Sequence, residues 1–136
     1  MSEDGDGSPD VIELRLGTEL DNLPIIRSLT SSIAMRADFD LDAIADLKLA
    51  VDEACSTLIT RATPGSTLVC TFTVHKDEIQ FAVRASATED VRPSQDSFGW
   101  RVLTTLTDHA NSWVQPDGTQ HLVHIEVAKR RAGGTA

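Results

Sequence analysis

The segment at residues 41–61 constrains the fold of this 136-residue chain most strongly, because its apolar residues recur at helical spacing throughout. At about 100° per residue, one stripe of the expected helix is apolar and a different face is acidic and hydroxyl-bearing. The apolar stripe contains Leu47, Val51, Ala54 and Leu58, with Ile44 and Cys55 beside it. The second face contains Asp46, Ala50, Glu53 and Thr57. The stripe requires a second layer to pack against, and the second face is where a functional site is expected.

Length and composition predict one domain between two polar tails. A chain of this size with 40% apolar residues can build a single core. We expect the domain at residues 10–130, with disordered tails at 1–9 and 131–136 that have little to bury. The sequence has no apolar run of membrane-spanning length, and its acidic start does not resemble a signal peptide. A cytoplasmic protein is therefore expected.

Charge and cysteine content exclude several classes of function. The net charge of −9, from 21 acidic and 12 basic residues, argues against nucleic-acid binding, which needs a basic surface. The acidity indicates either a basic protein partner or simply a soluble surface. Cys55 and Cys70 fall in apolar patterns, so we interpret both as small buried residues rather than disulfide or metal ligands. The four histidines are scattered without ligand spacing, so a metal site is not expected.

The periodicities along the chain predict five strands and three helices. Alternating apolar residues indicate strands at 11–17, 67–75, 78–86, 112–115 and 121–128. Helical spacing indicates helices at about 21–35, 41–61 and 97–109. Because the strands occur largely as hairpins with helices grouped between them, we expect a two-layer α+β sandwich. Its sheet should be mixed but mostly antiparallel, with the helices on one face.

Polar residues at the expected boundaries indicate caps and turns. Asp21 or Asn22 is expected to cap the first helix, and Asp40 the second. A tight hairpin is expected at residues 76–77 and a turn at 116–118 before the last strand. We interpret Trp100 and Trp113 as core or interface anchors rather than ligand-stacking residues.

The phrase LDAIADLKLAVDEACSTLI, together with the element order, resembles the RsbW-like anti-sigma factors and serine kinases of the GHKL ATPase superfamily. The resemblance covers about residues 10–130 and suggests an actinobacterial-looking variant. In that family this helix reads roughly D-x-K-x-A-V-x-E-A-x-x-N. The matching positions here are Asp46, Lys48, Ala50, Val51, Glu53 and Ala54. The resemblance implies a Bergerat-type GHKL ATPase fold.

The resemblance also implies a function and its partners. Such proteins are dimers that bind a sigma factor, prevent its use of RNA polymerase, and are countered by anti-anti-sigma proteins. They bind ATP with Mg²⁺ and phosphorylate a serine of the anti-anti-sigma partner. Glu53 corresponds to the family's glutamate, which would act as general base in an active kinase. Arg27, expected on the outer face of the first helix, lies near the position of a sigma-docking arginine.

Three of the family's nucleotide and metal contacts are altered in this chain. Thr57 occupies the position of the Mg²⁺-binding asparagine, and a threonine hydroxyl is a poorer ligand for a hard cation than an amide oxygen. Ala85 and Ala87 occupy the positions of the aspartate and glycine that read adenine. Without that carboxylate the adenine amino group loses its acceptor, so the resemblance implies weak ATP and Mg²⁺ binding.

The remaining nucleotide positions implied by the resemblance lie around the last helix and the last turn. Ser97 replaces the first glycine of the family's Gly-x-Gly, and Gly99 retains the second. The N-terminus of that helix can still attract a phosphate group. Thr119, after Gly118, resembles the Gly-Thr before the family's last strand.

Three functions follow as alternatives. The first is an anti-sigma factor that works by binding, with Arg27 as a docking residue. The second is an active ATP-dependent serine kinase in which Glu53 is the base and other groups replace the altered contacts. The third is a small-molecule sensor whose vacated adenine pocket is lined by Ala85, Ala87 and Cys55. For Arg27, Glu53 and Thr57, an ordinary surface or packing role also remains open.

Overall fold

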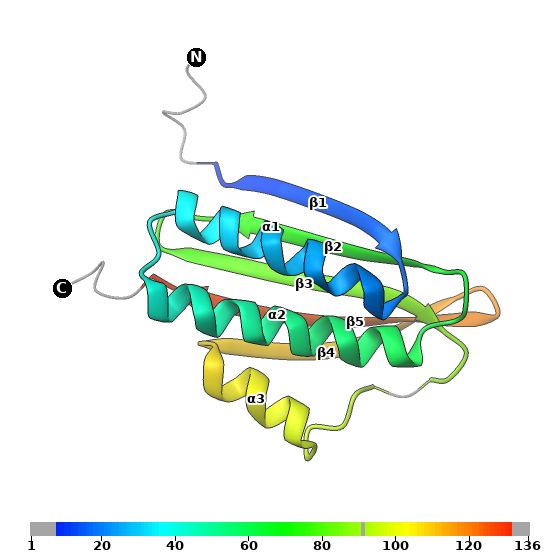
Figure 1. Cartoon of the computed structure of the whole chain (residues 1–136). Helices are drawn as coiled ribbons and strands as arrows, with labels where there is room; N and C mark the ends of the chain where they lie inside the picture. The colour runs from blue at the N-terminus through cyan, green and yellow to red at the C-terminus, as the bar shows by residue number, and fades with distance from the viewer. Residues whose placement is uncertain (1–7, 91, 132–136) are drawn as a thin grey trace.

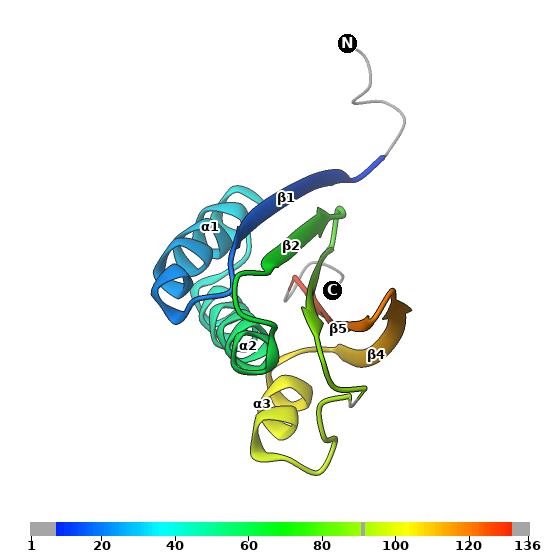
Figure 2. The ribbon, with the colours of Figure 1, turned by 90° about the vertical axis from the view of Figure 1, so that its right-hand side faces the viewer.

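The computed structural model describes residues 8–90 and 92–131, which form a five-stranded sheet with helices on one face (Figures 1 and 2). The strands are β1 (Asp10–Gly17), β2 (Thr67–Val74), β3 (Glu78–Ala87), β4 (His109–Asp117) and β5 (Gln120–Arg130). A 3-10 turn η2 (Leu20–Asn22) precedes the helices α1 (Leu23–Arg36), α2 (Leu41–Arg61) and α3 (Phe98–Leu106). The predicted α+β class and element order are confirmed.

The structure describes only the inner ends of the two predicted tails, residues 8–9 and 131. Residues 1–7 and 132–136, which make up most of those tails, lie outside the described residues. Arg131, placed in the C-terminal tail by the sequence, donates from its backbone N–H to the carbonyl of Asp77 at 2.8 Å. Within the described residues, no helix is both long and apolar enough to cross a membrane.

The sheet has the order β1-β2-β3-β5-β4, and each pairing is antiparallel, which corrects the expectation of a mixed sheet. The reason lies in the connections. The helices α1 and α2 form a hairpin that returns the chain to the end of the sheet it left, so Gly17 of β1 pairs with Thr67 of β2. The connection through α3 joins β3 to β4, but β5 lies between these two strands and pairs with both.

The core lies between the inner face of the sheet and the helices. The predicted apolar stripe of α2 is buried there, with Leu47, Val51, Ala54 and Leu58 at most 1% exposed. The rings of Phe72 and Phe81 meet beneath it with centroids 4.9 Å apart. Cys55 and Cys70 are free and fully buried in this core, as predicted. The hydrogen bond between their thiols, together with burial, raises the pKa of Cys55 well above its ordinary value, so this thiol stays protonated at neutral pH.

The two tryptophans lie on opposite sides of the sheet. Trp100 of α3 is half-buried and packs against the core. Trp113 of β4 stacks on His124 of β5, with ring centroids 4.6 Å apart and planes 9° from parallel. Partial burial, and secondarily the charge of Arg84, lower the pKa of His124. Trp100 is therefore a core contact, whereas Trp113 lies on the sheet face that the helices leave uncovered.

The helix caps are partly as predicted. The Asp40 carboxylate accepts a hydrogen bond from the backbone N–H of Ala43 at 2.8 Å, which confirms it as the cap of α2. The prediction of a side-chain cap for the first helix by Asp21 or Asn22 was wrong. The Asn22 amide instead donates to the Gly17 carbonyl at 2.8 Å, because η2 forms an additional turn before α1.

Two predicted boundaries near the C-terminus were also wrong. The third helix ends at Leu106 rather than at His109, because His109 already pairs with Ala128 in the sheet. The last hairpin turns at residues 118–119 rather than 116–118, and Gly118 has the positive φ of 63° that the turn needs. Pairing with β5 therefore extends β4 at both ends.

Candidate functional site

Glu53 and Thr57 lie one turn apart on the same face of α2, as predicted from their spacing. The Thr57 hydroxyl donates a hydrogen bond to Oε2 of Glu53 at 3.2 Å. Both side chains are half-buried. The hydroxyl that was expected to contact a metal is therefore engaged by the neighbouring carboxylate.

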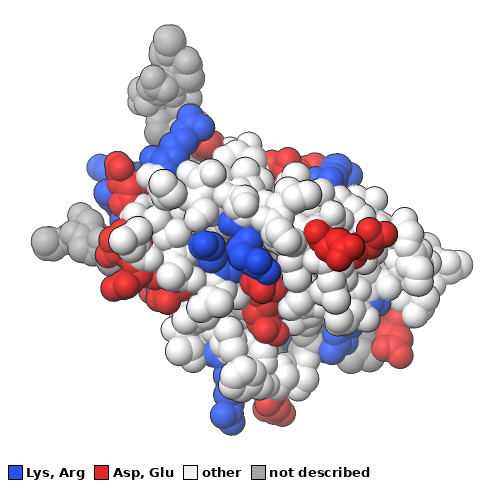
Figure 3. Space-filling view, viewed as in Figure 1, with Lys and Arg blue, Asp and Glu red and all other residues white. Residues whose placement is uncertain are grey.

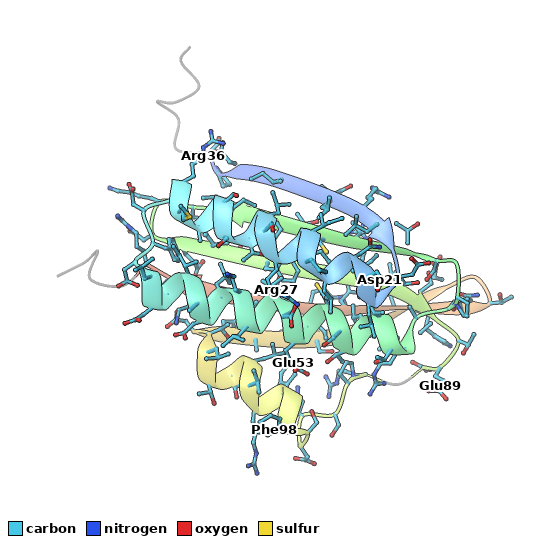
Figure 4. All side chains as sticks on the ribbon, in the orientation of Figure 1. Asp21, Arg27, Arg36, Glu53, Glu89 and Phe98 are labelled. Atoms are coloured by element: carbon cyan, nitrogen blue, oxygen red, sulfur yellow. The ribbon has the colours of Figure 1, made fainter. Side chains whose placement is uncertain are left out.

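The first turn of α3 brings Gly99 against Glu53. A Cβ atom at position 99 would overlap the Glu53 carboxylate and would lie 3.1 Å from its Cδ atom. The glycine thus leaves room for the carboxylate at the beginning of α3. Figure 4 shows Glu53 on the side of α2 that faces α3. A negative charge is favourable at the beginning of α3, because the free N–H groups of a helix N-terminus carry partial positive charge. The Glu53 side chain thereby occupies the region where a phosphate would be attracted.

Ser97 serves as the N-cap of α3. Its hydroxyl accepts from the backbone N–H of Trp100 at 3.1 Å and donates to the Ser94 carbonyl at 2.8 Å. The segment before it is held to the sheet by Arg92, whose guanidinium donates to the Ser112 carbonyl of β4 at 3.4 Å. The residue that replaces the family's first glycine therefore starts the helix.

Ala85 and Ala87 lie on the inner face of β3 and belong to the core. Their exposed fractions are 2% and 4%, and Cys55 has none. Neither alanine has a side-chain acceptor that could read the adenine amino group. Because all three residues are buried, they do not line the open apolar pocket that the sensor hypothesis requires.

Thr119 is exposed in the turn between β4 and β5. Its neighbour Gln120 accepts a hydrogen bond from the Thr63 hydroxyl at 3.0 Å, which ties this turn to the segment after α2. Among the described residues, no hydrogen bond joins Thr119 to Glu53. The structure therefore brings together Glu53, Thr57 and Gly99, but not Thr119.

Asp46, also on the second face of α2, is part of a different cluster. Its carboxylate accepts from the ammonium group of Lys129 at 3.2 Å, and that group also donates to the Leu106 carbonyl at 3.0 Å. This contact joins α2, α3 and β5 at the other end of the helical layer. Ala50, from the same predicted face, is fully buried. The predicted polar face is therefore two separate clusters with a packed residue between them.

Arg27 points outward from α1, as predicted, and forms an ion pair that sequence reasoning missed. Its guanidinium contacts Oδ1 of Asp52 on α2, at 2.9 Å from Nη2 and 3.1 Å from Nε. The two residues are at similar distances in sequence from the connection at 37–40, since Arg27 is 10 residues before it and Asp52 is 12 residues after it. In an antiparallel helix hairpin, that symmetry is a signal that could have identified the pair.

The residues present do not fit the Mg²⁺-nucleotide complex as the resemblance expects it. The Thr57 hydroxyl is engaged by Glu53, and the Glu53 carboxylate occupies the start of α3. Ala85 provides no acceptor for a base. Across the described residues, no group of three or more histidine, cysteine or acidic side chains is arranged to hold a metal ion.

Comparison with known proteins gives the class that this fold defines. Residues 16–125 match the model of the histidine kinase-like ATPase domain family. The anti-sigma-F factor RsbW of Mycobacterium tuberculosis is 39% identical over 129 residues, which cover 91% of this chain and 76% of the relative. Taken together, these matches show that the chain belongs to the RsbW-like group of the histidine kinase-like ATPase family.

Two further relatives carry the name serine-protein kinase RsbW. The protein of Halalkalibacterium halodurans is 30% identical over 76 residues, covering 55% of this chain and 47% of the relative. The protein of Bacillus pumilus is 28% identical over 96 residues, covering 66% of this chain and 59% of the relative. The family resemblance inferred from the helix at 41–61 is thus confirmed.

Proposed function

We propose that this protein is an anti-sigma factor that works by binding. It sequesters a sigma factor in the cytoplasm, where that factor would otherwise engage RNA polymerase, and an anti-anti-sigma protein counters it. Its similarity over 91% of the chain to a protein named anti-sigma-F factor supports this function. We also propose that it acts as a homodimer, as the RsbW resemblance implies.

One structural observation favours a binding function over phosphoryl transfer. Around Glu53, the polar groups at the expected nucleotide positions are engaged by one another or replaced by buried alanines. By contrast, Arg27 is 44% exposed at its side chain despite its ion pair with Asp52. An exposed, oriented guanidinium is suited to a carboxylate of a protein partner. Arg27 is accordingly the proposed docking residue.

The test is binding of the sigma factors encoded in the same genome by the purified protein, measured by calorimetry. Arg27→Glu should weaken the complex by roughly 100-fold, since it places a like charge against the partner's carboxylate. Arg36→Glu is the matched control, because Arg36 is an exposed arginine at the C-terminal end of the same helix, α1. This variant should bind like the wild type. Equal affinity of both variants would remove Arg27 from the proposal.

A charge swap separates docking from a purely structural role of Arg27. The double variant Arg27→Glu/Asp52→Arg restores an ion pair between α1 and α2 with the charges exchanged. If Arg27 contacts the sigma factor, binding stays weak in the double variant. Recovery of wild-type affinity would mean that Arg27 serves only to hold Asp52.

A serine kinase is the second candidate, favoured by the retained Glu53 and by the names of two relatives. Titration of the protein with ATP, with and without Mg²⁺, decides between the candidates. Absence of binding at millimolar ATP would exclude the kinase. Binding with Mg²⁺, together with transfer of phosphate to a serine of an anti-anti-sigma protein, would establish it.

A further inference from the structure

Three hollows that share lining residues follow one another across the outer face of the helical layer from α1 to α3. A hollow between α1 and α2 is lined by Arg27 and Lys48. The next hollow shares both residues and adds Leu49 and Asp52. A third hollow, of about 610 Å³ between α2 and α3, again includes Leu49 and Asp52, and it also includes Glu53. We call the part formed by Lys48, Leu49, Phe98, Arg101 and Val102 the outer groove.

The outer groove has an apolar floor that the rest of the described chain does not cover. Leu49 is 58% exposed and Phe98 is 81% exposed, and the two side chains line the same hollow. On α3, Phe98 and Val102 stand one turn apart and form a second apolar stripe. The first stripe, with Trp100 and Leu103, faces the core. This helix therefore has more apolar surface than its own fold buries.

The edges of the outer groove are cationic. Lys48 on α2 and Arg101 on α3 have no ion-pair partner within residues 8–90 and 92–131, whereas Asp52 is neutralised by Arg27. Figure 3 shows basic side chains near the centre of this face, over α1 and α2, with acidic side chains directly below them. The chain as a whole carries a net charge of −9. Along the three hollows the basic residues Arg27, Lys48 and Arg101 outnumber the acidic residues Asp52 and Glu53. This local excess of positive charge on an acidic protein favours an acidic partner segment over a basic one.

We infer that the outer groove binds an amphipathic helix of the sigma factor, with apolar residues on Leu49, Phe98 and Val102 and carboxylates beside Lys48 and Arg101. Helices commonly dock in this way, with an apolar face in a groove between two helices and charges along its edges. The inference rests on the proposed function for the identity of the partner. It goes beyond that proposal by adding a contact surface on α3 and by stating that the docked segment is acidic.

Cysteine footprinting tests the apolar floor. Both natural cysteines are fully buried, so an introduced surface cysteine would be the accessible thiol of the folded protein. Leu49→Cys and Phe98→Cys are compared with Leu41→Cys, a control on α2 that is 83% exposed and outside the groove. Saturating sigma factor should slow maleimide labelling at positions 49 and 98 by roughly 10-fold or more, and at position 41 by less than about 2-fold.

Charge reversal tests the chemistry of the partner. The variant Lys48→Glu/Arg101→Glu should weaken sigma binding by roughly 10-fold or more, while Lys76→Glu in the β2–β3 turn should leave it unchanged. Tighter binding by the double variant would show that the docked segment is basic and would overturn the inference.

The possible failures are distinguishable. If a sigma factor binds the wild type but positions 49 and 98 label at the same rate as in the free protein, the outer groove is not the docking site and the proposed function stands. If no sigma factor binds the wild type, the proposed function itself fails, and it does so before any footprint is measured.

Discussion

Asp52 and Glu53 are adjacent acidic residues on α2, yet their surroundings differ in kind. The Glu53 side chain lies against Gly99 of α3 and accepts a hydrogen bond from the hydroxyl of Thr57 on α2. Asp52 turns toward α1 and forms an ion pair with Arg27 on an exposed face. The first carboxylate is used within the fold, whereas the second leaves an arginine oriented at the surface. The comparison teaches that Glu53, which matches the catalytic motif, has its contacts within the fold, whereas Arg27, outside the motif, stays exposed at the surface.

The energetics of the two regions differ accordingly. A half-buried hydrogen bond to a carboxylate is costly to break, because the charge then loses a donor that water replaces only in part. An exposed ion pair contributes little to stability, since water and salt screen both charges. Changes near Glu53 should therefore affect folding, and changes around Arg27 and Leu49 should affect binding.

The largest effect is expected from returning the family's carboxylate to β3. Ala85→Asp places a charge at a position that is 2% exposed, so the free energy of unfolding should fall by about 3–5 kcal/mol in urea denaturation at pH 7. Ser86→Asp, on the other face of the same strand and half-buried, is the control and should cost far less. A stable Ala85→Asp variant that gains ATP affinity would contradict our description of a packed site.

A smaller effect is expected from removing the donor to Glu53. Thr57→Val keeps the shape but deletes the hydroxyl, and should lower the free energy of unfolding by roughly 1–2 kcal/mol. The control is Thr60→Val, three residues later on α2, because the Thr60 hydroxyl is exposed and donates to a backbone carbonyl. Equal stability of Thr57→Val and wild type would show that water replaces the hydrogen bond.

Gly99→Ala should have a still smaller effect, which depends on Glu53. The added methyl group displaces the carboxylate, but this lies at the end of a flexible side chain, so we expect a loss of roughly 0.5–1 kcal/mol. In the Glu53→Ala background the same change should be neutral or slightly stabilising, because alanine favours a helix over glycine. Gly17→Ala has room for its methyl group and serves as the control. A loss of the same size in both backgrounds would exclude the contact as its cause.

The smallest effect on stability is expected on the outer face. Leu49→Gln removes an exposed apolar side chain from α2 and should change the free energy of unfolding by less than about 0.5 kcal/mol. Leu47→Ala, two residues earlier and fully buried, should cost about 2–5 kcal/mol in the same assay. Should Leu49→Gln destabilise as strongly as Leu47→Ala, the outer groove would be part of the core rather than a free surface.

Helical periodicity alone was sufficient to predict much of α2. Local spacing places Leu47 in the core and puts Glu53 beside Thr57, since both follow from the geometry of one helix. The Asp40 cap was equally local, because its acceptor and donor are three residues apart. Features of this kind need no knowledge of how helices pack on one another.

The sequence was insufficient where the outcome depends on tertiary placement. The close approach of Gly99 to Glu53 arises only when α3 packs on α2, and the sequence around either residue does not predict it. The end of α3 was mispredicted because helical spacing continues beyond Leu106. In the structure His109 belongs to β4, where it pairs with Ala128 of β5. The antiparallel pairing throughout the sheet likewise depends on the position of β5 between β3 and β4, which are consecutive along the chain but do not pair with each other.

The burial of α3 has a consequence for local opening. Leu103 is its one fully buried side chain, whereas α2 buries a whole stripe of residues along its length. Helices with little buried apolar surface separate from a domain at lower free energy than the sheet unfolds. The backbone amides of α3 should therefore exchange with deuterated water faster than those of α2 and β3. When α3 detaches, it moves away from the Glu53 carboxylate and the outer groove loses one wall, so the contacts of Glu53 and the docking surface depend on the same helix.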